Sequence, residues 1–178
     1  MSVIIETARL RLRPPAMADA PAIARYLNNF AVAGNLARVP HPYRLADAER
    51  WLGSLRPEPP AAETDFAIEL GAVGYVGQIG FHLTDGEAEL GYWLAEPFWH
   101  RGLMSEATRA VVDWYFGTTD APRIRSGVFS FNKASLAVQR KLGFTETGSS
   151  RRHCLARGEE LRHIDTQLSR ADWAGVPT

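Results

Sequence analysis

The stretch from residue 73 to residue 116 constrains the fold of this chain most, because strand patterns, a tight loop and a helical pattern follow one another directly. Residues 73–83 and 87–94 carry strand-like sequences, and Asp85-Gly86 between them is a strong hairpin signal. Residues 102–116 then show a helical apolar face of Leu103, Ala107, Ala110, Val111 and Trp114. This succession predicts a sheet with a helix packed across it.

Residues 99–105 connect the hairpin to that helix and have the features of an anion-binding loop. The first turn of a helix carries N–H groups without intrahelical acceptors and the positive end of the helix dipole. Gly102 permits close approach of a ligand to the backbone, and Arg101 adds a permanent cation. The loop therefore predicts a phosphate site, although an ordinary strand-to-helix connection could have the same residues.

A second helix is predicted over residues 132–142, with Asn132 as its N-cap and Gly143 as its C-cap. The apolar residues recur at helical spacing and predict a buried stripe of Ala134, Val138 and Leu142. The remaining side chains are expected to face elsewhere, among them Asn132, Ser135, Gln139 and Arg140.

The rest of the chain alternates between short strand and helix patterns. Strands are expected over residues 9–13, 66–70 and 123–131, with a closing hairpin of 144–154 and 161–168, and helices over 19–28 and 45–55. The loop that holds Gly34, Pro40 and Pro42 is a candidate substrate wall. The sum predicts one mixed α+β domain over residues 1–178.

Charge and cysteine content exclude several kinds of function. The 20 basic and 20 acidic side chains cancel, so no overall field favours nucleic acid or an anionic membrane. Cys154 is the single cysteine, which excludes an internal disulfide and makes a metal cluster unexpected. No signal segment follows Met1, and no apolar run approaches the about 20 residues that span a bilayer. We therefore expect a cytoplasmic protein without a metal.

Taken together, these motifs resemble the GNAT superfamily of N-acetyltransferases, in particular the branch that acetylates the N-termini of ribosomal proteins. The similarity runs from the opening strand at 5–13 through 90–94 to the segment 132–144 and Asp172-Trp173. The family's loop pattern Q/R-x-x-G-x-G/A falls on residues 99–104 with Gly102 at its fixed glycine, while Trp99, His100 and Met104 depart from the usual residues. The resemblance implies a mixed, mostly antiparallel sheet flanked by helices, in which two central strands splay apart.

The resemblance also implies acetyl-CoA as co-substrate and assigns residues to it. The backbone at Leu94 would pair with pantetheine, the N–H groups from His100 to Ser105 would hold the pyrophosphate, and Asn132 and Arg140 would contact the cofactor. The cofactor set is thus Leu94, Trp99, His100, Arg101, Gly102, Leu103, Met104, Ser105, Asn132 and Arg140. Ser135 would protonate the departing thiolate, and the acceptor amine would attack the thioester directly in a ternary complex.

The general base is less clear from the sequence. Glu89 ranks first, followed by Glu106 and His82, although each also has a structural explanation as a solvated carboxylate, a helix-dipole partner or a core histidine. Tyr92 and Trp93, with His82, are expected to wall the acceptor pocket.

We therefore expect an acetyl-CoA-dependent N-acetyltransferase that acts on a primary amine. The lack of an obvious strong base favours the α-amine of a protein or peptide, whose pKa of about 7.7–8.0 lies below that of lysine. A small-molecule amine acetyltransferase and a non-catalytic acyl-CoA sensor are the alternatives. A homodimer is possible in such a family.

Overall fold

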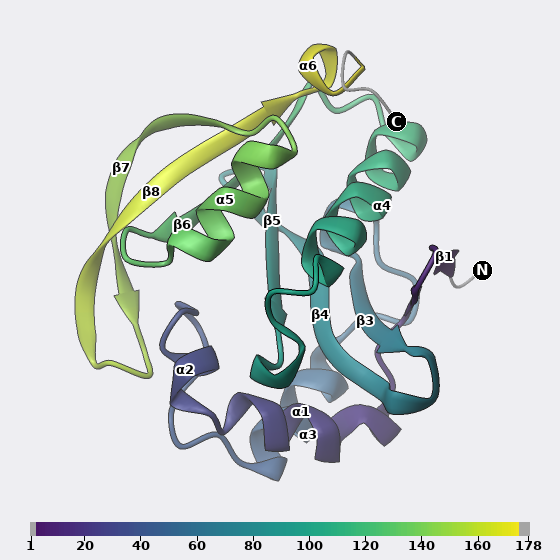
Figure 1. Ribbon diagram of the computed structural model, residues 1–178, viewed down its shortest axis with the longest axis vertical. Helices are drawn as coiled ribbons and strands as arrows, with labels where there is room; N and C mark the ends of the chain where they lie inside the picture. The colour runs from purple at the N-terminus through teal and green to yellow at the C-terminus, as the bar shows by residue number, and fades with distance from the viewer. Residues whose placement is uncertain (1–2, 175–178) are drawn as a thin grey trace.

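The hairpin of residues 73–94 forms the centre of an eight-stranded sheet (Figure 1). The structure, a computed structural model, describes residues 3–174. The strands lie in the order β1-β2-β3-β4-β5-β6-β8-β7 and pair antiparallel except for the parallel pair β5–β6. Their bounds are β1 (Ile5–Glu6), β2 (Leu10–Arg13), β3 (Asp65–Leu70), β4 (Gly74–Thr84), β5 (Glu87–Leu94), β6 (Arg123–Phe129), β7 (Thr145–Cys154) and β8 (Glu159–Ser169). The mixed, mostly antiparallel sheet confirms the predicted fold class.

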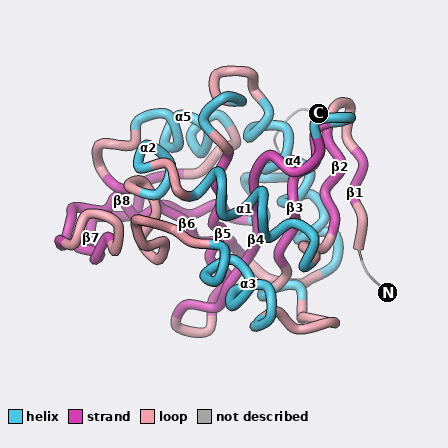
Figure 2. The backbone as a smooth tube through the Cα atoms, turned by 90° about the horizontal axis from the view of Figure 1, so that it is seen from below, coloured by secondary structure: helices cyan, strands magenta, loops and turns pink. Residues whose placement is uncertain are grey.

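The helices cover both faces of this sheet. They are α1 (Ala20–Leu27), α2 (Phe30–Ala33), α3 (Leu45–Ser54), α4 (Leu103–Thr118), α5 (Lys133–Lys141) and α6 (Arg170–Ala174). Figure 2 shows α4 and α5 on one side of the sheet and α3 on the other. Sequence patterns predicted the longer helices but missed the short helices α2 and α6.

Two hydrophobic clusters hold the layers together. The larger lies between the sheet and α4, and it contains Phe66, Ile79, Leu90 and Val111. The smaller joins α1 and α3 to the opposite face of the sheet. Successive strand residues project to opposite faces, so the even-numbered positions of β4 from Gln78 to His82 lie on the α1–α3 face. The smaller cluster does not cover this part of the sheet.

The buried face of α5 differs from the predicted stripe. Ala134 is exposed, Val138 is half-buried, and the fully buried positions are Leu136, Gln139 and Leu142. Gln139 is buried because its amide is fully used: Nε2 donates to Ser126 Oγ at 2.8 Å, and Oε1 accepts from Thr166 Oγ1 at 2.7 Å. The face of α5 that packs on the sheet therefore includes a polar residue, hydrogen-bonded at both ends of its amide, that an apolar pattern alone does not select.

Candidate active site

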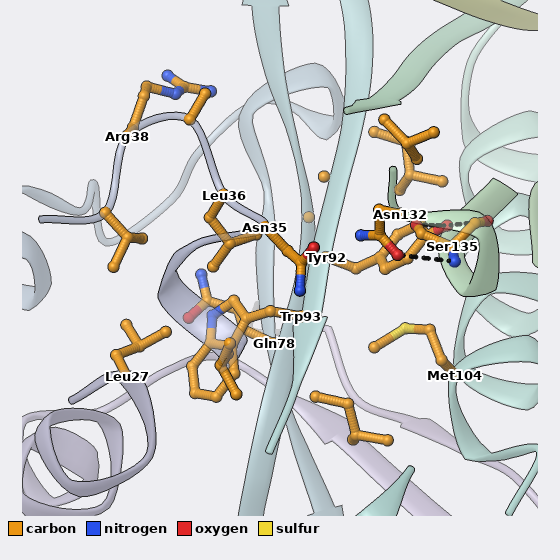
Figure 3. A pocket seen from close by; sticks show the side chains of 18 of the residues that line it. Leu27, Asn35, Leu36, Arg38, Gln78, Tyr92, Trp93, Met104, Asn132 and Ser135 are labelled. Carbon is orange, nitrogen blue, oxygen red and sulfur yellow. Dashed lines mark hydrogen bonds between the residues drawn. The ribbon is translucent and has the colours of Figure 1, made fainter. Parts of the chain in front are cut away.

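A cavity of about 1150 Å³ passes through the sheet where β5 and β6 separate. It is lined from one side by the start of α4 and by α5, and from the other by α1, the loop after α2, α3 and the strands β4 and β5. Figure 3 shows Asn35, Leu36 and Arg38 on one side of the cavity and Asn132 and Ser135 on the other, with Tyr92 between them. The cavity therefore connects the two faces of the sheet.

The separation of β5 and β6 exposes backbone groups of β5. The two strands share one parallel bridge, Glu89 with Arg125. On the other side of β5, the Ala95 N–H donates to the Val76 carbonyl at 2.9 Å. Since hydrogen-bonding direction alternates along an antiparallel strand, the backbone groups of Tyr92 and Leu94 face the gap.

One of these groups already has a partner. The Leu94 carbonyl accepts a hydrogen bond from Trp99 Nε1 at 2.7 Å. The Leu94 N–H and the backbone of Tyr92 are left to pair with an extended ligand arm, as an added strand would. Trp99, predicted as a loop residue that contacts the cofactor, thus also fixes the loop to the end of β5.

The predicted anion loop has the geometry of such a site. His100 has φ 58° and Gly102 has φ 72°, and these left-handed residues turn the chain into α4. Among residues 3–174, the N–H groups from His100 to Ser105 have no hydrogen-bond acceptor, and Glu106 is the first whose N–H bonds a preceding carbonyl, that of Gly102 at 3.1 Å. Six adjacent free donors at a helix N-terminus fit a pyrophosphate.

Asn132, Ser135 and Tyr92 meet on the α5 side of the gap (Figure 3). Asn132 Oδ1 caps α5 by accepting the Ser135 N–H at 3.1 Å, which leaves its amide NH₂ facing the cavity region. Ser135 Oγ donates to the Tyr92 hydroxyl at 2.9 Å. Burial raises the pKa of Tyr92 to about 12, so the hydroxyl pair stays protonated at neutral pH. Tyr92, expected in the acceptor pocket, turns its hydroxyl to the α5 side.

A row of glycines forms the floor of the cavity on the α1–α3 face. Gly80 of β4 pairs with Gly91 of β5, and Gly127 of β6 lies two residues beyond Arg125 just as Gly91 lies two beyond Glu89. Gly91 is exposed although β5 is a central strand. The missing side chains leave the sheet surface open to a ligand.

Two side chains from neighbouring strands reach over this floor. A Cβ on Gly80 would lie 2.4 Å from Asp65 Oδ1, and a Cβ on Gly127 would lie 2.2 Å from His163 Cε1. Asp65 belongs to β3 and His163 to β8, and both line the cavity. Only glycine at positions 80 and 127 allows them to occupy these places.

Glu89, the first-ranked base, lines the cavity but is held in an ion pair. Its carboxylate accepts two hydrogen bonds from the Arg152 guanidinium, at 2.6 Å and 3.2 Å, and its side chain is 7% exposed. Burial opposes ionisation, but the hydrogen bonds and charge of Arg152 outweigh it and hold the pKa of Glu89 below its ordinary value. A carboxylate in this state is a weak proton acceptor.

His82 lines the cavity beside this pair, as predicted, with Nε2 3.8 Å from Glu89 Oε1. Burial and the positive charge of Arg38 lower the pKa of His82, so its ring is neutral at pH 7. Trp93 also lines the cavity and packs on Tyr75 with ring centroids 5.9 Å apart. Both residues, which were expected to wall the acceptor pocket, lie on the α1–α3 face.

Three residues of the predicted site lie outside the cavity lining. Glu106 faces the opposite way, where its carboxylate accepts from Thr7 Oγ1 at 2.7 Å and from Arg9 Nε at 2.7 Å. Glu106 therefore anchors the N-terminal strands to α4, and its carboxylate is not placed to act as the base. Arg140 pairs with Glu146 on the surface, and Arg101 stacks over Phe98 at 5.9 Å. Both are placed to act on a ligand only from outside the cavity.

Sequence reasoning missed Asp65, Arg152 and His163, which line the α1–α3 end of the cavity. The position of Asp65, directly before a predicted strand, gave no sign that its side chain lines a cavity. The spacing of His163 and Asp165 was an available signal, because two polar residues at i and i+2 of a strand share one face.

The described residues form no group of three or more histidine, cysteine or acidic side chains that could hold a metal ion. Across residues 3–174, no helix is both long and apolar enough to cross a membrane. Cys154 is buried against the loop after α2.

Comparison with known proteins identifies the kind of site. The model of the acetyltransferase (GNAT) domain matches residues 9–145. The chain is 27% identical over 175 residues to the uncharacterized N-acetyltransferase p20 of Bacillus licheniformis, covering 95% of this chain and 97% of that protein. It is 31% identical over 84 residues to the [ribosomal protein uS5]-alanine N-acetyltransferase of Escherichia coli, covering 47% of this chain and 43% of that protein.

A solved acetyltransferase structure shares this fold. The structure of RimJ from Mycobacterium smegmatis in complex with CoA-disulfide superposes with a TM-score of 0.81 at 23% identity, covering 99% of this chain and 89% of that one. At this identity the likeness concerns the fold.

Proposed function

Since the chain belongs to the GNAT acetyltransferase family and is an acetyl-CoA-dependent N-acetyltransferase, we propose that its acceptor is the α-amine at the N-terminus of a peptide or protein. The observation that carries this proposal is the continuity of the cavity from the free N–H groups of α4 to the carboxylate of Asp65 on the opposite face. An amine that enters the cavity from the α1–α3 side would approach acetyl-CoA, bound on the α4–α5 side, through the gap between β5 and β6.

The residues present fit acetyl-CoA. When bound, acetyl-CoA supplies the acetyl group as an activated thioester. The N–H groups from His100 to Ser105 would hold its pyrophosphate, the free backbone groups of Tyr92 and Leu94 would bind its pantetheine arm, and the Asn132 amide NH₂ would donate to that arm. The hydroxyl of Ser135 holds a proton at the gap that can pass to the departing sulfur, and the Tyr92 hydroxyl holds Ser135 Oγ in place through a hydrogen bond.

The acidic residues at the proposed acceptor end of the cavity, on the α1–α3 face, favour a cationic substrate. Three carboxylates line the cavity, those of Asp47, Asp65 and Glu89. Asp47 pairs with Arg50 at 3.1 Å and Glu89 pairs with Arg152, whereas Asp65 has no ion-pair partner within the described chain. Asp65 Oδ1 accepts from Gln78 Nε2 at 2.9 Å, which orients the carboxylate. We assign Asp65 to attract the ammonium form of the acceptor.

The α-amine is favoured over lysine because a group with a pKa of about 7.7–8.0 needs little assistance to lose its proton near neutral pH. The Escherichia coli relative, an alanine N-acetyltransferase of a ribosomal protein, points to the same acceptor class.

The test is to incubate the protein with acetyl-CoA and a peptide that carries both a free N-terminus and an internal lysine, then to locate the acetyl group by mass spectrometry. We expect the label on the α-amine. The same peptide with a blocked N-terminus is the control and should remain unmodified. Label on lysine alone, or turnover only with small amines such as polyamines or amino sugars, would reject the proposed acceptor.

A further inference from the structure

His163 and Asp165 form a hydrogen-bonded pair on β8, facing the cavity side of the sheet. His163 Nδ1 lies 2.8 Å from Asp165 Oδ1. Ser150 on the neighbouring strand β7 donates to the same Oδ1 at 2.9 Å. The carboxylate is thus held from two directions, and a carboxylate at Nδ1 favours the tautomer that carries its proton there. Nε2 of that tautomer is a proton acceptor.

The ring of His163 lies across β6, one of the two strands that separate. Its Cε1 occupies the space that a side chain at Gly127 would take, at 2.2 Å from the position of a Cβ. Phe129 packs edge-on against the ring with centroids 5.8 Å apart. Packing on both sides fixes the ring at the edge of the gap.

Nε2 of His163 is open. Within residues 3–174 it has no hydrogen-bond partner, and no buried side-chain nitrogen or oxygen of that region lacks one. Nε2 is therefore accessible to solvent, and His163 lines the cavity between β5 and β6. A fixed imidazole with an open acceptor nitrogen is suited to proton transfer.

The charges around the ring keep it neutral. Burial lowers the pKa of His163 most, and the positive charge of Arg152 on β7 lowers it further, against the opposing effects of Asp165 on β8 and Glu89 on β5. The ring is thus ready to accept a proton at pH 7.

The rival groups in the cavity are placed less well. Glu89 is neutralised by Arg152. His82, like His163, lies one strand from the gap, but the carboxylate nearest its ring is Glu89 at 3.8 Å from Nε2, whereas Asp165 lies 2.8 Å from His163 Nδ1 and orients that ring. Asp65 lies on β3, a further strand away from the gap.

We propose that His163 is the general base of the acetyl transfer and that Asp165 is its positioning residue. The proposal rests on the proposed function in that the acceptor is an amine. One N–H bond of the acceptor ammonium breaks, its proton moves to His163 Nε2, and the electron pair stays on the amine nitrogen for attack. The imidazolium is stabilised by the carboxylate of Asp165 and returns the proton to water in the cavity.

The experiment compares wild type with His163→Gln, Asp165→Asn and His153→Gln, using any amine that the wild type acetylates. His153 is exposed on β7 outside the cavity, so its variant is the matched control and should keep wild-type rates. We expect His163→Gln to lower kcat about 100-fold or more while KM for acetyl-CoA and the melting temperature change little. The acidic limb of the kcat against pH profile should disappear.

Asp165→Asn keeps the histidine and gives a second reading if His163→Gln fails to fold. Because Asp165 raises the pKa of His163, its loss should move the acidic limb of kcat to lower pH. The ring can also be followed without turnover, by NMR titration of the His163 Cε1 proton in wild type and Asp165→Asn. The titration midpoint should shift in the same direction as the kinetic limb.

Each result has one meaning. If wild type acetylates no amine, the proposed function fails, and the titration still tests the pairing of His163 with Asp165. If wild type is active and His163→Gln retains its kcat and its pH profile, or if Asp165→Asn moves neither the limb nor the titration midpoint, His163 is not the base.

Discussion

Ser135 Oγ on α5 lies 2.9 Å from the Tyr92 hydroxyl on β5, and the Tyr92 hydroxyl donates in turn to the Ser135 carbonyl at 3.2 Å. The pair connects the strand on one side of the gap to the helix that follows the strand on the other side. Two hydroxyl protons are therefore held where the α5 side of the cavity meets the gap.

The first prediction is that Ser135→Ala lowers kcat only modestly, by about tenfold or less. A thiol with a pKa of about 8.5 departs as a thiolate with little help near pH 8. Tyr92→Phe should have a similar effect, and the double variant should lose less than the product of the two, because both act through one pair. Thiol release measures the rate, and Ser149→Ala on the exposed face of β7 is the control. A strictly multiplicative loss would show that the hydroxyls act separately.

The second prediction concerns the left-handed residues of the anion loop. Gly102→Ala should destabilise the fold by about 1 kcal/mol, since a β-carbon is strained at φ 72° while its nearest neighbour, Arg9 Nη2, is at an ordinary 3.6 Å. It should also weaken acetyl-CoA binding, because the loop can relax away from the geometry that aims its N–H groups. Wild type at 100 times its Kd should gain about 5–10 °C in melting temperature.

Gly117→Ala is the control for that experiment, because it has open space and lies inside α4 away from the loop. It should keep the full thermal response to acetyl-CoA. An equal response from Gly102→Ala would mean that the loop does not hold the cofactor.

The local structure of the proposed cofactor side could be predicted from sequence because its signals are local. The turn at Asp85-Gly86 has φ 53° and 79°, as its residue types require, and the helix caps and loop glycine occur within a few residues of the groups they serve. Local chemistry of this kind does not depend on which strands become neighbours.

The α1–α3 end of the cavity, which we propose receives the acceptor, could not be predicted in this way, because it is assembled by strand order. β8 lies between β6 and β7, which places His163 over Gly127, while Arg152 of β7 reaches Glu89 of β5 across the intervening strands. The sequence separation of Arg152 and Glu89 is 63 residues. Glu89 was a reasonable base as an isolated strand carboxylate, and only its distant partner changes its chemistry.

The third prediction is that Asp65→Asn separates stability from activity. Burial raises the pKa of Asp65 to about 6, above the value of about 3.9 in an unfolded chain. The stabilising effect of this shift is present below pH 4 and is lost as the pH rises through 6, so above pH 6 the folded state bears the cost of a buried charge. A neutral amide at this position would remove that cost, and the melting temperature of the variant at pH 7.5 should rise above that of wild type.

The same variant should raise KM for the acceptor, by about tenfold, because the amide no longer attracts an ammonium group. Its Oδ1 can still accept from Gln78, so the local structure is preserved. In wild type, kcat/KM for the acceptor should fall below about pH 6, and the part of this fall due to Asp65 should be missing in the variant. A variant with unchanged KM at pH 7.5 would remove Asp65 from acceptor binding.

The final prediction uses the open floor of the cavity. A Cβ at Gly91 would meet only His82 Cε1, at 3.9 Å, and the residue lies in extended strand, so Gly91→Val should fold with little strain. Its methyl groups would occupy the space above the sheet that the acceptor needs. We expect acceptor turnover to fall at least 100-fold while the thermal response to acetyl-CoA remains, since the anion loop lies elsewhere. Gly53→Ala, with open space on α3, should change neither. If Gly91→Val lost the acetyl-CoA response but kept its fold, the glycine floor would belong to the cofactor, and the acceptor would have to approach the gap from another side.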